Sequence, residues 1–149
     1  MRKMWKKIFI TAALVLLLCL TGLVMSGEAK AQRCVDNGDG TVTDNVTGLM
    51  WQKANAGPMN WDDAMSYASG LSLGGHSGWW LPNRDELSGL YHSPCKNMMN
   101  VERWFYWSST PYADDALKLN VWRVHFYFGC VDLGSKSNSY YVRAVRSAQ

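Results

Sequence analysis

The clearest change in the pattern of apolar and polar positions falls near the middle of the chain. Residues 79–81 form an apolar block that ends at Pro82, which has no amide proton to donate to a sheet. Asn83 follows and stands three residues before Glu86, the spacing of a helix N-cap and its reciprocal partner. This pattern predicts a buried strand that leads directly into a short capped helix over residues 84–91.

An earlier helix is predicted to begin after Asn60. Asn60 is a favourable N-cap, and Asp62 and Asp63 complement the positive end of a helix dipole. The glycines at Gly74 and Gly75 mark the end of this segment. Apolar residues recur at spacings of three and four, which gives the helix one apolar stripe: Trp61, Ala64, Met65 and Ala68.

Strand patterns lie on both sides of the two helices. From residue 33 the chain reads as three short strands, separated by turn residues at 36–40 and 45–48. Residues 92–104 have little periodicity and are predicted to form an irregular loop. The remaining strand-like runs cover residues 105–109, 116–128 and 140–146.

The middle run, residues 116–128, alternates between two faces. One face carries Trp122, Val124, Phe126 and Phe128, and the other carries Arg123, His125 and Tyr127. We expect the first face to lie in the core of an antiparallel sheet and the second to point outwards. Helices and antiparallel strands in one chain predict an α+β protein.

The first 31 residues read as a secretory signal peptide. A basic start precedes an uncharged stretch over residues 8–25, and Ala29 and Ala31 form a small-x-small cleavage site. The alternative is an uncleaved membrane anchor, because the uncharged stretch is nearly long enough to span a bilayer. We expect cleavage before Gln32 and one domain over residues 32–149. The protein would then be periplasmic or extracellular, meeting the membrane only through its leader.

Charge and composition change the picture once the leader is set aside. The whole chain has a net charge of +3, but residues 32–149 hold ten Lys or Arg and eleven Asp or Glu. A nucleic-acid partner is not expected, because it would need a basic surface. The same residues contain seven Trp, seven Tyr and three Phe. Most of these rings should fill the core, and others would be exposed to sugars or protein partners.

Three cysteines follow the leader: Cys34, Cys95 and Cys130. An exported chain meets an oxidising environment, so one disulfide is expected and one cysteine is left over. Cys95 and Cys130 are the preferred pair, and a loop of that length would stabilise the fold by roughly 3–4 kcal/mol. No Cys/His cluster has the spacing of a zinc site, and we expect neither a metal nor a cofactor.

Several blocks of the sequence, taken in order, resemble the Lcl C-terminal domain family: residues 36–44, 47–51, 71–75, 80–82, 106–110 and 136–143. The resemblance covers nearly all of residues 32–149. It implies a C-type-lectin-like fold in which two helices flank a small, twisted antiparallel sheet with long loops. It also implies an exported bacterial protein, and the best-known members of the family are surface adhesins that bind sulfated glycans.

The chain departs from this family in two places. Many members carry cysteines where this chain has Ala68 and Ala144, and the resemblance implies that Cys95 and Cys130 replace that pair. Calcium-dependent lectins of this fold place Glu or Gln before a Pro-Asn or Pro-Asp pair, and this chain has Leu81 there. A calcium-type sugar site is therefore not expected.

A ligand site is expected on the polar loop before the middle strand and on the outward face of that strand. Rings on the loop would stack on sugar faces, and its polar groups would orient hydroxyls. Arg123 and His125 on the strand would meet sulfate or carboxylate groups. The alternative is an ordinary solvated loop with local ion pairs. The loop residues concerned are Tyr112, Asp114, Asp115, Lys118 and Asn120.

These features predict an exported, non-enzymatic binding module of the adhesin type, which recognises a glycan or a cell-surface protein. One alternative is an oxidase on the formylglycine-generating scaffold, which would use Cys95 and Cys130 as its paired cysteines. Another is a purely structural component of the cell envelope. His76, His92 and His125 lack the spacing of a metal site, and no Ser lies in a Gly-x-Ser-x-Gly motif.

Overall fold

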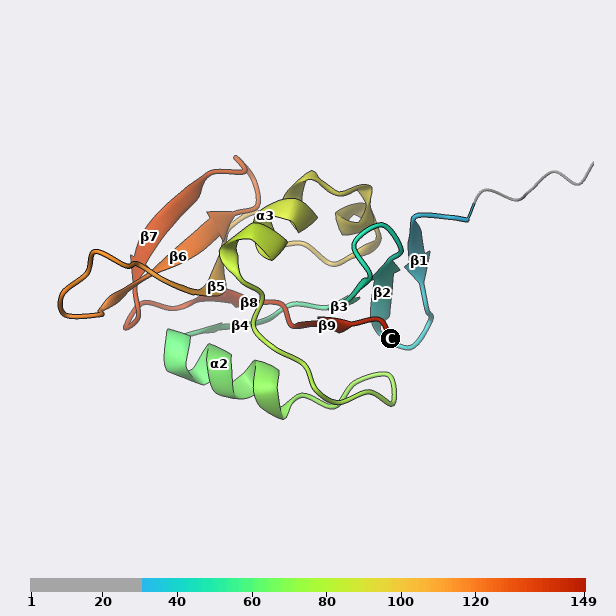
Figure 1. Cartoon of the computed structure of the whole chain (residues 1–149), viewed down its shortest axis with the longest axis horizontal. Coiled ribbons are helices and arrows are strands. Elements are labelled where there is room, and N and C mark those ends of the chain that lie inside the picture. Colours follow the sequence, from blue (N-terminus) through green and yellow to red (C-terminus); the bar gives the residue numbers. More distant parts are fainter. Residues whose placement is uncertain (1–30) are drawn as a thin grey trace, which may run out of the picture. The chain divides into compact units, whose positions relative to one another are not determined.

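The computed structural model describes residues 31–149 (Figure 1). The predicted signal peptide lies outside this range except for Ala31. Residues 32–149 make up one compact unit. No helix among the described residues is long and apolar enough to cross a membrane.

The first three strands and the last strand of the described chain form a four-stranded antiparallel sheet in the order β1-β2-β3-β9. Its strands are β1 (Cys34–Asp36), β2 (Thr41–Asp44), β3 (Leu49–Gln52) and β9 (Val145–Ser147). The two predicted turns are confirmed. Gly38 and Gly48 adopt φ angles of 75° and 68°, a region of backbone conformation that favours glycine.

A second, five-stranded sheet has the order β4-β8-β5-β6-β7. Its strands are β4 (Ala56–Met59), β5 (Phe105–Pro111), β6 (Asn120–His125), β7 (Val131–Ser135) and β8 (Tyr140–Val142). All neighbours are antiparallel except β5 and β8, which run parallel. The predicted run 140–146 is thus split between the two sheets, and the single antiparallel sheet expected from the sequence is in fact two sheets with one parallel pair.

Both predicted helices are present, as α2 (Trp61–Gly70) and α3 (Arg84–His92). The side-chain oxygen of Asn60 accepts the backbone amide of Asp63 at 2.9 Å. Asn83 and Glu86 form the predicted reciprocal cap, with hydrogen bonds of 2.7 and 2.8 Å. A 3-10 helix, η1 (Pro94–Met98), interrupts the segment that was expected to be irregular.

The apolar block before α3 is not a strand. Trp80 alone pairs with Val145, through backbone hydrogen bonds of 2.8 and 3.0 Å. Trp79 and Leu81 are buried on either side of it, whereas the Trp80 side chain is exposed. The block therefore fills the core by its side chains, with little sheet pairing.

Both faces of the five-stranded sheet are buried, each under one helix. Tyr106 and Val124 pack in a cluster with Leu87 and Leu90 of α3. Trp107 and Val121, on the opposite face, pack in a second cluster with Ala64 and Ala68 of α2. In Figure 1, α2 and α3 accordingly lie on opposite sides of β8.

The predicted alternation of buried and exposed side chains along residues 116–128 is partly wrong, because both faces of the sheet are buried. Val121 and Val124 are both fully buried, although they lie on different faces. The strand also ends at His125, and the next three residues form a turn. Phe128 was expected in the core, but 71% of its surface is exposed.

Candidate functional site

A groove of about 450 Å³ lies where α3, η1 and the turn after β6 meet. We call it the η1 groove. It is concave, partly apolar and lined by a few polar groups, as small-molecule sites in proteins commonly are. Its lining residues are Tyr91, Lys96, Asn97, Met99, Val101, Arg103, Phe126 and Tyr127.

Two cations and two tyrosine rings give the η1 groove its chemistry. Lys96 Nζ lies 3.9 Å from the ring centroid of Tyr91 and donates a 2.6 Å hydrogen bond to the Tyr91 carbonyl oxygen. The guanidinium carbon of Arg103 lies 5.5 Å from the ring centroid of Tyr127. Among the described residues, neither cation forms an ion pair with a carboxylate. Both charges are therefore free to meet an anionic ligand.

The wall formed by residues 99–103 is fixed by Arg143, which is fully buried. Arg143 Nη1 donates to the carbonyl oxygens of Gln52 and Lys53 at 2.5 and 2.6 Å, and Nη2 donates to the carbonyl of Asn100. Burial lowers the pKa of the Arg143 guanidinium, and its partners are neutral carbonyls. The backbone amide of Glu102 donates to Tyr106 Oη at 2.8 Å and holds the same segment.

Arg143 is not among the functional residues expected from the sequence. The signal that could have found it is a lone cation in an apolar run, with Val142 before it and Ala144 and Val145 after it. A cation in such a run must find several hydrogen-bond acceptors when the run is buried.

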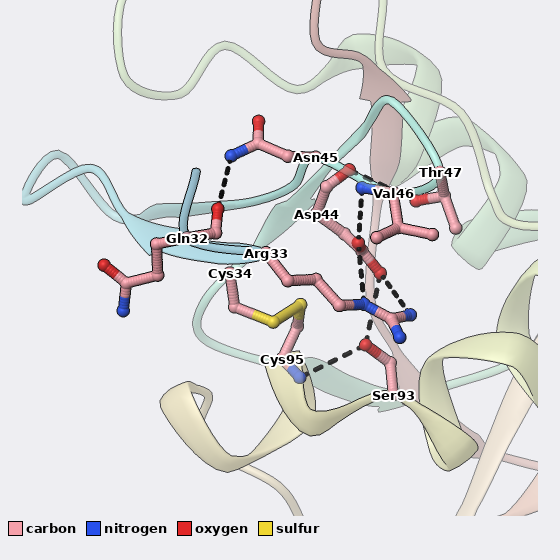
Figure 2. The surroundings of a disulfide bond; sticks show 9 residues. All are labelled: Gln32, Arg33, Cys34, Asp44, Asn45, Val46, Thr47, Ser93 and Cys95. Carbon is pink, nitrogen blue, oxygen red and sulfur yellow. Dashed lines mark hydrogen bonds and ion pairs between the residues drawn. A yellow bond between two sulfur atoms is a disulfide. The ribbon is translucent and has the colours of Figure 1, made fainter. Parts of the chain in front are cut away.

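A disulfide between Cys34 and Cys95 fixes the other wall (Figure 2). The two Cα atoms are 5.2 Å apart, and the bond joins β1 to η1, next to Lys96. The expected pair of Cys95 and Cys130 is wrong. Cys95 lies in η1 and its side chain is fully buried against β1. Cys130 is an exposed free cysteine after the β6 turn.

Asp44 is a buried carboxylate beside this disulfide. It accepts two hydrogen bonds of 3.1 Å from Arg33 and one of 3.1 Å from Ser93 Oγ, and Ser93 Oγ in turn accepts the Cys95 amide (Figure 2). Burial alone would raise the pKa of Asp44. Hydrogen bonds from Arg33, Val46 and Ser93, together with the Arg33 charge, outweigh burial and hold that pKa below its usual value.

Three exposed aromatic residues, which we call the aromatic rim, lie in or next to the lining of the η1 groove: Tyr127 lines it, and Trp104 and Phe128 directly follow the lining residues Arg103 and Tyr127 in the chain. Trp104, Tyr127 and Phe128 expose 52%, 53% and 71% of their surface. His125 holds the turn that carries two of these rings, because its Nδ1 accepts the amides of Tyr127 and Phe128 at 3.1 and 3.4 Å. Exposed rings of this kind are suited to stacking on the faces of sugars.

The family profile of the Lcl C-terminal domain matches residues 40–146. The chain belongs to the Lcl C-terminal domain family. No curated protein matches the chain. The match begins after β1, so Cys34 lies outside the matched part of the domain while its partner Cys95 lies inside it.

The expected ligand loop of this Lcl C-terminal domain lies at the opposite end of β6 from the η1 groove. Asp115 closes the loop by accepting the Asn120 amide at 2.6 Å and the Leu117 amide at 3.2 Å. The first of these hydrogen bonds is the main reason why the pKa of Asp115 is lowered. Asp114 and Lys118 are exposed, and Lys118 adopts a φ of 54°.

The loop's aromatic residue, Tyr112, is partly exposed, and its ring meets Trp122 edge to face at 5.6 Å between centroids.

The expected strand residues of the domain are committed to internal contacts. Arg123 pairs with Asp132 at 3.0 Å and stacks on the rings of Phe105 and Tyr140, at 3.6 and 4.6 Å. His125 is buried among rings and serves the turn described above. The structure therefore does not bring the seven expected residues together into one site. Over residues 31–149, no three His, Cys, Asp or Glu side chains cluster as metal ligands would.

Proposed function

We propose that residues 32–149 form an exported, non-enzymatic binding module whose η1 groove takes an acidic glycan. The observation that carries the proposal is the pair of cations, Lys96 and Arg103, each lying over a tyrosine ring and neither neutralised by a carboxylate. Sulfate or carboxylate groups would meet the cations, and the sugar rings would meet the aromatic rim.

The net charge of the unit makes a local site necessary. Residues 32–149 carry one more acidic than basic side chain, so a polyanion gains nothing from the overall charge. Attraction must come from cations concentrated at one place, and the η1 groove supplies two. The α+β arrangement, with a helix on each face of the larger sheet, supports the proposal of a C-type-lectin-like fold.

The disulfide pairing disfavours the oxidase alternative. It needs Cys95 and Cys130 as a reactive pair, and Cys95 is buried in a disulfide with Cys34. A purely structural envelope component remains the competing proposal, and the binding experiment below separates the two.

The test is a calorimetric titration of residues 32–149 with heparin. Replacing both cations (Lys96→Ala with Arg103→Ala) should weaken binding about 100-fold, because two charge-assisted contacts are lost. The control is Lys118→Ala with Arg146→Ala, which removes the same charge far from the groove lining and should leave the affinity within about twofold.

Binding through these cations should also weaken as salt is added. A glycan array covers ligands other than heparin and is run with and without calcium. An array with no binding partner at all would favour the structural envelope component. Equal losses in the two double variants would contradict the proposed site.

A further inference from the structure

We propose a second binding site, for a neutral hydroxyl-bearing saccharide, in a hollow of about 510 Å³ at the other end of β6 and β7. We call it the α2 hollow. It rests on the proposed function only for the class of ligand, since it shares no lining residue with the η1 groove. Its lining residues are Asn60, Asp62, Leu119, Ser135, Lys136 and Ser137.

The walls of the α2 hollow are tied together without a ligand. The Lys136 amide donates to the Leu119 carbonyl at 2.8 Å, which joins the β7 end to the β5–β6 loop. The Trp61 amide donates to the Lys136 carbonyl at 3.1 Å, which joins the same residue to the start of α2. Three segments far apart in the sequence thus form a preorganised concavity, which lowers the ordering cost of binding.

The hollow carries one acid and one base that do not neutralise each other. Asp62 and Lys136 both line it, yet they form no ion pair. Lys136 Nζ instead lies 4.4 Å from the ring centroid of Trp61. The charges of Asp62 and Lys136 still cancel overall, so charge alone favours neither an anionic nor a cationic ligand, and a neutral ligand can use both groups as hydrogen-bond partners.

A sugar ring can form hydrogen bonds with the polar groups that line the hollow. Its hydroxyls can donate to the Asp62 carboxylate and accept from the Lys136 ammonium. Ser135 Oγ and Ser137 Oγ lie 2.9 Å apart and can donate or accept beside them. Leu119, which is 54% exposed, offers an apolar wall to the C–H face of the ring.

The β5–β6 loop contributes to this site through its shape. Asp115 accepts the amides of Leu117 and Asn120 and so fixes the backbone on both sides of Leu119. The loop expected from the sequence to bind a ligand thus supplies one wall of the hollow, although its own charged side chains do not line it.

The test is an NMR titration of residues 32–149, labelled with ¹⁵N, with the methyl glycosides of glucose, galactose, mannose and N-acetylglucosamine. At least one glycoside should give saturable shifts of the Leu119 and Ser135–Ser137 amides. Asp62→Ala should weaken that binding about tenfold, because a charged hydrogen-bond acceptor is lost.

Two matched variants make the result decisive. Asp85→Ala also removes an acid from the first turn of a helix, α3, but Asp85 neither lines the hollow nor bonds a residue that does, and this variant should bind the glycoside within about twofold of the unaltered chain. Lys136→Met keeps an apolar stem beside Trp61, removes the ammonium, and should weaken binding about tenfold.

Absence of saturable shifts at the hollow with all four glycosides, or equal effects of Asp62→Ala and Asp85→Ala, would overturn the second site. The result is independent of the η1 groove. Lys96→Ala with Arg103→Ala should leave the glycoside shifts unchanged, whatever that variant does to heparin binding.

Discussion

Two irregular segments flank the larger sheet, residues 93–104 and residues 112–119, and they are held in different ways. The first is tied to distant parts of the chain by the disulfide at Cys95 and by Arg143 at Asn100. The second is held mainly by its own Asp115, and one backbone hydrogen bond from Lys136 to Leu119 ties it to the end of β7. Both segments look alike in sequence, because neither has a hydrophobic period. Lack of periodicity therefore identifies an irregular segment but does not reveal whether it is anchored or what it can bind.

The strongest test of this comparison is the removal of Arg143. Arg143→Met leaves the carbonyls of Gln52, Lys53 and Asn100 without their donor, and should lower the free energy of unfolding by about 3–5 kcal/mol. Urea denaturation of residues 32–149 measures the change. Arg146→Met, three residues later and partly exposed, should cost far less. Similar losses in the two variants would mean that Arg143 does not anchor the first segment.

The disulfide gives the next largest effect. Its cysteines are 61 residues apart in sequence, and the double variant Cys34→Ser with Cys95→Ser should lose about 4 kcal/mol in the chain-entropy model. Cys130→Ser should leave the free energy of unfolding unchanged, since Cys130 is free and exposed. Urea denaturation measures both, and peptide mapping without reduction should recover Cys34 linked to Cys95. A peptide that links Cys95 to Cys130 would contradict the structure.

The smallest effects come from two carboxylates, one for each segment. Asp44→Asn removes a buried acceptor beside η1 and should cost about 1–3 kcal/mol. Asp115→Asn should leave the urea midpoint unchanged and only speed the hydrogen exchange of the Leu117 and Asn120 amides. A large shift of the midpoint by Asp115→Asn would mean that the second segment is coupled to the core after all.

The pH dependence of Asp44 has a definite sign. Its pKa is lowered in the folded state, whereas an unfolded aspartate titrates near about 3.9. The stability that it contributes is therefore complete above about pH 4 and is lost as the pH falls through the lower folded pKa. Asp44→Asn should lose less stability on acidification than the unaltered chain, and urea denaturation at a series of pH values measures this.

Local patterns predicted local structure well. The caps at Asn60 and Asn83 and the turns around Gly38 and Gly48 depend on residues a few positions apart, and all four are present. Long-range pairing could not be read in the same way. The split of residues 140–146 between two sheets depends on partners in β3, β4 and β5, which no local period encodes.

The proposed η1 groove could not be predicted from local patterns, because its residues come from segments far apart in the chain. The residues expected to bind a ligand are polar residues of a loop and a strand, and three of them, Arg123, Asp115 and His125, use polar atoms in internal contacts. The η1 groove draws its residues from α3, η1, the loop between η1 and β5, and the turn after β6. Lys96 and Arg103 could not be predicted as site residues, because nothing near them in the sequence indicates that they share a groove with Phe126 and Tyr127.

The disulfide has a practical consequence for anyone who shortens this chain. A fragment cut to residues 40–146, the part that the family profile matches, would discard β1 together with Cys34. Cys95 would then be an unpaired thiol in the interior. On partial unfolding it could form a disulfide with the exposed Cys130 of another molecule. Recombinant versions should start no later than Gln32 and be produced where thiols are oxidised, otherwise mixed disulfides and aggregates will obscure every binding measurement.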